Sequence, residues 1–151
     1  MKRCILALVF LMSACSIGKS DKNVSKIASD EEIISAVQGC YVVEGVEIVN
    51  SNFPDHPAIT QVLNAKQLCA SNFGQLVINA TDANGTKVAG DWGVSVSQAQ
   101  PRCFCYQFEG FDASALFSFE ARTADPAAAI ELTISHVGLQ STWKFTLGQR
   151  S

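Results

Sequence analysis

Only two histidines, His56 and His136, occur among the 151 residues of this chain. It also contains no G-x-S-x-G motif, no glycine-rich phosphate loop and no zinc or calcium signature. A Ser-His-Asp or Cys-His catalytic arrangement would need one of the two histidines. His136 continues an apolar alternation, where a hydrogen-bonded histidine at a strand end is the simpler interpretation. We therefore predict that the protein is not an enzyme, has no catalytic residues, and binds no metal or cofactor.

One pair of carboxylates could still carry catalytic chemistry. Glu109 and Asp112 could in principle supply an acid and a base for the hydrolysis of a glycan. They flank Gly110 at a predicted turn, where two solvated side chains are the usual explanation. A glycan hydrolase is therefore the last of the functional alternatives given below.

The sequence also lacks any run of about 18 apolar residues, the length that a helix needs to cross a bilayer. Its N-terminal apolar run, residues 4–12, is much shorter and follows Lys2 and Arg3. Ser13 and Ala14 then precede Cys15. A basic start, a short apolar run and small residues at the end are typical of a secretory signal peptide, which is removed.

At these residues the chain resembles a bacterial lipoprotein precursor, in which the cysteine after the small residues is acylated and becomes the mature N-terminus. The resemblance covers residues 1–15 only. It implies a lipid anchor at Cys15 that holds the protein on a membrane, and Ser16 in the next position implies the outer membrane of the bacterial cell envelope. The domain would lie in the periplasm or at the cell surface. The alternative is an ordinary secretory signal, cut near residues 16–18, which would remove Cys15.

Cleavage would divide the chain into a signal peptide (1–14), a lipidated cysteine with a flexible tether (15–28) and one β-rich domain (29–151). The mature chain of 137 residues is long enough to bury its own core. Nine Lys and Arg would remain against 14 Asp and Glu, a net charge of −5 with histidine neutral. This acidic balance argues against a nucleic-acid partner. It would suit a cationic protein, although solubility is the more common explanation.

Four cysteines remain after cleavage, and an even number in an exported chain predicts two disulfides. Cys103 and Cys105 flank Phe104 in a predicted strand, which would hold their Cα atoms roughly 6.5 to 7 Å apart, at the limit for a bridge. We therefore expect each of them to pair with Cys40 or Cys69. The sequence does not choose between the two pairings.

The domain is expected to begin with a helix, because Ser29 and Glu32 form a capping box ahead of an apolar stripe. A strand is predicted over residues 41–49, and a second helix over residues 57–70, with Pro57 in its first turn. The loop before that helix combines polar and aromatic groups. Its residues Phe53, Asp55 and His56 either contact a partner or simply lead into the helix.

Period-two alternation dominates the rest of the chain, and the Asn84-Gly85 step is a strong hairpin signal. Strands are predicted over residues 76–80, 86–89, 92–97, 103–108, 115–119, 130–134 and 143–147. Turns rather than helices join them, so we expect antiparallel pairing. The predicted fold class is α+β, mainly β: an antiparallel β-sandwich or a curved antiparallel sheet with one or two short N-terminal helices.

Three functional classes are consistent with these residues. The first is a non-enzymatic envelope lipoprotein that binds another protein, as an accessory or assembly factor of a surface or secretion machine. The second is a lipid-anchored inhibitor of a cationic hydrolase, and the third is an envelope glycan hydrolase. We favour the first, because it requires no residues that the chain lacks.

Overall fold

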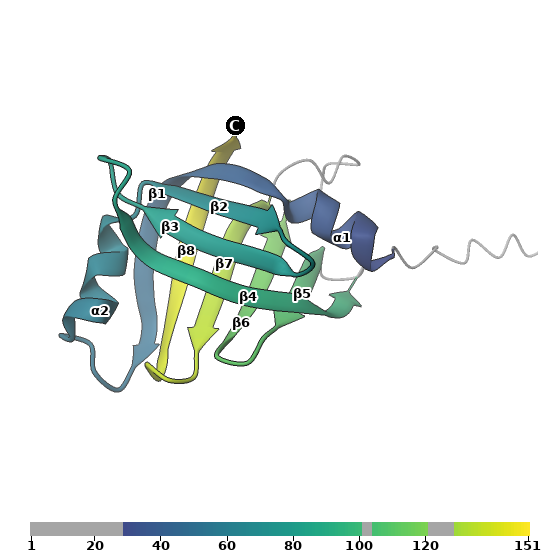
Figure 1. Cartoon of the computed structure of the whole chain (residues 1–151). Helices are drawn as coiled ribbons and strands as arrows, with labels where there is room; N and C mark the ends of the chain where they lie inside the picture. Colours follow the sequence, from purple (N-terminus) through teal and green to yellow (C-terminus); the bar gives the residue numbers. More distant parts are fainter. Residues whose placement is uncertain (1–28, 101–103, 121–128) are drawn as a thin grey trace, which may run out of the picture.

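A computed structural model describes residues 29–100, 104–120 and 129–151 of the protein. These residues form eight antiparallel strands, which close into a barrel in the order β1-β2-β3-β4-β5-β6-β7-β8 (Figure 1). The elements are α1 (Asp30–Val37), β1 (Gly39–Ser51), α2 (Pro57–Thr60), the 3-10 helix η1 (Gln61–Asn64), β2 (Gln67–Asn72), β3 (Leu76–Thr81), β4 (Lys87–Gln100), β5 (Cys105–Glu109), β6 (Ala113–Phe119), β7 (Ala129–His136) and β8 (Ser141–Arg150). The predicted signal peptide, Cys15, the tether and Cys103 lie outside the described residues.

The closed barrel corrects the predicted fold class, which was a sandwich or an open curved sheet. The first and last strands pair with each other, from Tyr41 opposite Arg150 to Ser51 opposite Ser141. Apolar alternation is the same in a sandwich and in a barrel, because both bury one face of each strand. The pairing that closes the barrel joins residues about 100 positions apart, and no local pattern encodes it.

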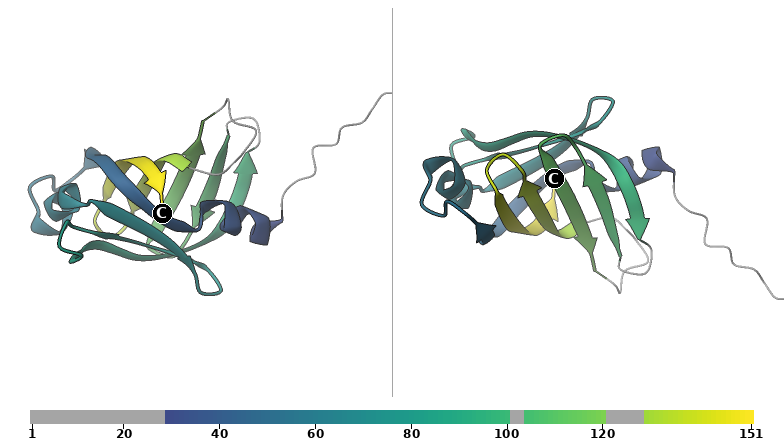
Figure 2. Two further views of the ribbon diagram at one scale, coloured as in Figure 1. Left: turned by 90° about the horizontal axis from the view of Figure 1, so that it is seen from above. Right: turned by 90° about the horizontal axis from the view of Figure 1, so that it is seen from below.

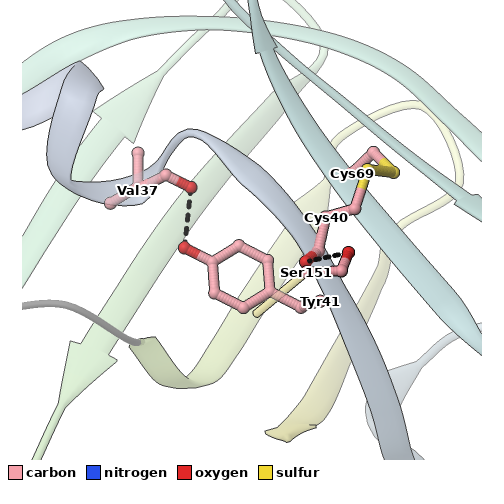
Figure 3. Close-up of a disulfide and its surroundings, with 5 residues drawn as sticks. All are labelled: Val37, Cys40, Tyr41, Cys69 and Ser151. Carbon is pink, nitrogen blue, oxygen red and sulfur yellow. Dashed lines mark hydrogen bonds between the residues drawn. A yellow bond between two sulfur atoms is a disulfide. The ribbon is translucent and has the colours of Figure 1, made fainter. Parts of the chain in front are cut away.

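Helix α1 begins as predicted. The Ser29 hydroxyl accepts a hydrogen bond from the Glu32 backbone N–H, and the Glu32 carboxylate accepts one from the Ser29 backbone N–H, which completes the capping box. Two side chains of the barrel then satisfy carbonyls of the last turn. The Tyr41 hydroxyl donates to the Val37 carbonyl (2.8 Å; Figure 3), and Arg150 donates to the Ala36 carbonyl (3.1 Å). The helix is therefore fixed to the barrel at its C-terminal end.

The second predicted helix is mostly wrong. Only residues 57–64 are helical, as a single α-helical turn followed by a 3-10 turn, and the chain then enters strand β2. Leu68 and Ala70 are buried in the barrel on alternate positions of β2, a period of two that the helical interpretation of residues 57–70 overlooked. The helical part buries Ile59 and Val62 against the core.

The predicted disulfide pairing is also wrong, because it depended on a strand that runs through Phe104. Cys40 and Cys69 occupy directly opposed positions on neighbouring strands β1 and β2, and they are bonded to each other (Figure 3). The predicted partnership of these two residues with Cys103 and Cys105 is therefore incorrect. Phe104 has a φ of +51° and precedes β5, so the strand does not run through residue 104 as expected. Cys105 is disulfide-bonded, and its partner lies outside the described residues.

The remaining strands follow the prediction with two corrections. The predicted strands at 86–89 and 92–97 are one long strand, β4, with an irregularity at Gly90 and Asp91. Ile130 is 43% exposed instead of sharing the inner face of Leu132 and Ile134, because the register shifts at the start of β7 and Ala129 takes the buried position. The Asn84-Gly85 hairpin is confirmed, with Gly85 at a φ of +77°.

Apolar side chains fill the barrel. The rings of Trp92 and Trp143 lie 5.9 Å apart, and Phe108 meets Phe117 edge to face. Helix α1 and the α2-η1 segment lie at different sides of the barrel and add to this core (Figure 2). Within the described residues, no helix has the length and apolarity needed to cross a lipid bilayer.

Candidate functional site

Three chain connections meet at one end of the barrel, along its lower edge in Figure 1. They are residues 52–56 after β1, residues 110–112 between β5 and β6, and residues 137–140 between β7 and β8. We call this set the loop rim. Asn52 bonds Gln140 through both its backbone and its side-chain amide, and the Val137 backbone N–H donates to the Asp112 carbonyl (2.8 Å). Neighbouring loops are thus tied to each other.

Each of these loops presents one large apolar side chain to solvent. Phe53 is 58% exposed, Val137 is 71% exposed and Phe111 is 97% exposed. Single exposed apolar residues are common on protein surfaces and need no explanation. Three of them on hydrogen-bonded neighbouring loops at one end of the molecule are less usual, and are typical of a contact surface.

The base of the β5-β6 loop is rigid. The Gly110 backbone N–H donates to the Ala113 carbonyl (2.8 Å). Gly110 also lies so close to β4 that a Cβ atom at this position would collide with the Gly93 carbonyl oxygen. Phe111 follows directly, so the backbone that leads to it is fixed at Gly110. Its ring is 97% exposed.

The β7-β8 loop confirms the structural interpretation of His136. Its Nδ1 atom accepts a hydrogen bond from the Leu139 backbone N–H (3.1 Å) at the end of β7. The Ser141 hydroxyl donates to the Leu139 carbonyl and also bonds the Ser51 hydroxyl, so β1, β8 and the loop share one network. His136 therefore shapes the loop that carries Val137.

The loop after β1 confirms the helix lead-in. His56 is the N-cap of α2, and its Nδ1 atom accepts from the Ala58 backbone N–H (3.1 Å). Phe53 and Asp55 are exposed beside it. A contact role for Phe53, Asp55 and His56 stays a prediction, but the structure places their loop next to residues 137–140.

A pocket of about 440 Å³ adjoins the loop rim. It lies where strand β4 runs past the end of β5, since β5 stops at Glu109, opposite Ser95, while β4 extends back to Lys87. We call it the rim pocket. Its lining includes residues 90–93 of β4, the whole β5-β6 loop with Glu109 and Asp112, and His136. Phe111 is thus both the most exposed of the three apolar rim residues and part of the pocket wall.

The rim pocket is acidic. Three carboxylates line it, those of Asp91, Glu109 and Asp112, and no lysine or arginine is among its described lining residues. Lys87 compensates Asp91 at 2.6 Å. Glu109 accepts a hydrogen bond from the neutral Gln107 amide, and neither Glu109 nor Asp112 forms an ion pair with any described residue. Two negative charges are therefore uncompensated at this pocket.

Besides the carboxylates, the pocket lining includes Trp92, whose indole N–H is a hydrogen-bond donor. Trp92 is 7% exposed and borders the rim pocket. Trp143 donates its indole N–H to the Ile59 carbonyl, whereas the Trp92 indole N–H has no hydrogen-bond partner among the described residues. No side-chain nitrogen or oxygen in the same residues is fully buried and unbonded, so this N–H must meet solvent. Trp92 is among the residues that line the rim pocket.

No known protein family, characterised protein or solved structure matches this chain. Function must therefore be inferred from the residues of the loop rim and the rim pocket. Within the described residues, no group of three or more His, Cys, Asp or Glu side chains is placed to hold a metal ion.

Residues that the sequence analysis considered separately lie close together in the structure. Glu109, Asp112 and His136 line one pocket, and the Phe53 loop lies on the same rim. Phe111, Val137 and Trp92 were not singled out as site residues. The detectable signal was Phe111 itself, a large aromatic residue directly after a glycine in a predicted turn, where polar residues are usual. The disulfide of Cys40 and Cys69 lies beside α1 and takes no part in the rim.

Proposed function

We propose that this protein is a non-enzymatic lipoprotein of the bacterial cell envelope, which binds another protein through the loop rim. The observation that carries the proposal is the set of three hydrogen-bonded loops that each expose a large apolar side chain. Binding surfaces gain affinity when their anchor side chains are already held in place, because less conformational entropy is lost on association. Phe111 meets this condition in its backbone, because Gly110 is held against β4 and bonded to Ala113.

The position of the rim also supports a protein partner. Strand β1 begins beside α1 and reaches the rim 13 residues later, a length of roughly 40 Å of strand. A lipid at Cys15 would join the membrane to the N-terminal side of the domain through the predicted flexible tether. The rim lies at the other end of β1, where the tether leaves it free to meet another protein. No lysine or arginine is among the described residues that line the pocket, which also disfavours anionic lipid headgroups as its ligand.

Phe111 is the expected energetic centre of this contact. A buried aromatic side chain removes about 150 to 250 Å² from water, and at roughly 25 cal/mol per Å² this corresponds to several kcal/mol before the costs of association. Truncation of such an anchor typically costs about 2 kcal/mol or more, a loss of affinity of roughly 30-fold.

The experiment is site-specific photo-crosslinking with the full lipoprotein in intact cells. A crosslinking amino acid replaces Phe111 in one variant and Phe104 in the other, because Phe104 is also an exposed phenylalanine but lies at the opposite end of β5. We expect a defined product at position 111 only, and weaker binding of the identified partner by Phe111→Ala but not by Phe104→Ala. Equal crosslinking at both positions, or unchanged binding by Phe111→Ala, would contradict the proposal.

The acidic pocket favours one second candidate, a lipid-anchored inhibitor of a cationic hydrolase. In that case the partner would be the hydrolase, and the same rim would cover its active site. Inhibition assays with the identified partner separate the two. An inhibitor abolishes the partner's turnover at stoichiometric ratio, whereas an assembly factor leaves it unchanged.

A further inference from the structure

The rim pocket and the surface beside it carry an inference about the partner, which rests on the function proposed above. We infer that the partner inserts a basic side chain, arginine or lysine, into the rim pocket, beside the apolar contact made by Phe111. The rim thereby selects a cationic loop of the partner rather than an apolar surface in general.

Charge is the first argument. Glu109 and Asp112 bring two uncompensated carboxylates to a pocket that no described lysine or arginine lines. Opposite charges attract a partner over about 8 to 10 Å at physiological salt, so these groups act before contact is made. A guanidinium or ammonium group is the complement of two carboxylates that line one pocket. An anionic or phosphate-bearing ligand would be repelled.

Size and the Trp92 indole give the second argument. A volume of about 440 Å³ is more than sufficient for one long side chain and part of its backbone. A ligand that displaces water from the indole N–H must replace it with an acceptor, which a side-chain cation does not offer. A peptide segment offers both groups, a cation for the carboxylates and a backbone carbonyl for the indole N–H. A basic loop of a protein therefore satisfies the pocket more completely than a free cation does.

Proximity to Phe111 gives the third argument. The same loop supplies Phe111, which is almost fully exposed, and the two carboxylates that flank it. Apolar side chains provide most of the affinity of an interface, and flanking charges provide orientation and choice of partner. The β5-β6 loop carries both, so one partner loop can engage both.

The test uses the full-length lipoprotein in detergent micelles, with ¹⁵N-labelled tryptophan. Its two indole N–H resonances report on Trp92 and Trp143, and Trp92→Phe assigns them by removing one. The probe is the blocked tripeptide Gly-Arg-Gly, and the control is the same peptide with citrulline, which keeps the shape of arginine without its charge. We expect the arginine peptide to shift the Trp92 resonance in a saturable and salt-sensitive manner, while the Trp143 resonance stays in place because that group is buried and bonded to Ile59.

Charge-removing variants locate the site. Glu109→Gln and Asp112→Asn are each expected to weaken binding of the arginine peptide about threefold to fivefold, in line with single exposed ion pairs. The matched control is Asp55→Asn, because Asp55 lies on the loop rim but does not line the pocket. This control should bind the peptide as the wild type does, and an unmoved Trp143 resonance shows that each variant is folded.

Three results would overturn the inference. One is an equal response to the citrulline peptide, and another is an equal loss of affinity in Asp55→Asn. The third is a shift of the Trp92 resonance by chitotriose with none by the arginine peptide, which would instead favour a glycan. If the peptide fails but position 111 still crosslinks selectively, the rim binds a protein without a basic anchor. If neither responds, the proposed function fails as well.

Discussion

Tyr41→Phe tests how the N-terminal helix is attached to the barrel. The Tyr41 side chain is fully buried, and its hydroxyl donates to the Val37 carbonyl in the last turn of α1 (2.8 Å; Figure 3). The substitution keeps the ring and removes this donor, together with the hydroxyl's hydrogen bond to Arg150. Loss of one hydrogen bond to a buried carbonyl should cost about 1 to 2 kcal/mol of unfolding free energy, or roughly 3 to 8 °C in Tm for a domain of this size.

The same residue predicts a pH dependence. Burial raises the pKa of the Tyr41 phenol above its usual value of 10.0, and the nearby Arg150 partly opposes this effect. The neutral phenol is therefore favoured in the folded state, and the unfolded chain loses its proton first. The contribution of Tyr41 to stability is complete below about pH 10 and is lost as the pH rises above that value. The wild type should lose more stability than Tyr41→Phe over that range.

Urea unfolding followed by circular dichroism measures both effects. Tyr106→Phe is the matched control, because the Tyr106 ring packs against Phe119 but its hydroxyl makes no hydrogen bond with a described residue. This control should cost less than 0.5 kcal/mol, roughly the value for a substitution without a specific interaction. If Tyr41→Phe is no more destabilising than Tyr106→Phe, the bond to Val37 does not hold α1 in place.

Three further predictions concern the turn, the disulfide and the anchor. Gly85→Val should cost about 1 kcal/mol or more in urea unfolding, because Gly85 has a φ of +77° in otherwise open space; an unchanged midpoint would contradict this. Replacing both Cys40 and Cys69 by Ala should cost roughly 3 to 4 kcal/mol, the chain-entropy value for a separation of 29 residues, and reductant should leave that variant less affected than the wild type. Cys15→Ser should give a protein without lipid, and mass spectrometry of the wild-type N-terminus should find acylated Cys15; a mature N-terminus beyond residue 15 would contradict the anchor.

Features of the fold that depend only on residues close in the sequence were predicted correctly. The capping box at Ser29 and the Asn84-Gly85 hairpin are both present, because each depends on residues within one turn of the chain. The alternation of Trp143, Phe145 and Leu147 also places all three inside the barrel, as expected for a strand with one buried face.

Short-range sequence patterns could not predict the closure of the barrel or the disulfide, because both depend on which strands become neighbours. The pairing of β1 with β8 depends on the whole course of the chain, and Cys69 could be matched to Cys40 only after β2 was known to be a strand. The predicted helix over residues 57–70 failed because Ile59, Val62 and Leu63 fit a helical face over a single short stretch. After residue 64 the chain enters strand β2, which pairs with β1 and β3 in the barrel.

The candidate site was only partly predictable for the same reason. Phe53, Phe111 and Val137 are far apart in the sequence, and each alone is an ordinary turn residue. The order of strands in the barrel makes β8 a neighbour of β1 and β7 a neighbour of β6, so the three loops become adjacent. An up-and-down barrel always gathers alternate connections at one end, whereas the residues that those connections carry are free to vary.

The two ends of the barrel carry different kinds of side chain. The strands bury their apolar residues inside, and α1 ties the N-terminal side of the barrel to the chain that leads from the predicted anchor. Among the described residues of the opposite end, exposed apolar groups and uncompensated carboxylates lie together. Phe111 is almost fully exposed, and Glu109 and Asp112 pair with no described cation, so the core of the barrel does not depend on these side chains. Side chains that the core does not require, gathered on hydrogen-bonded loops, are the basis on which we propose a binding partner.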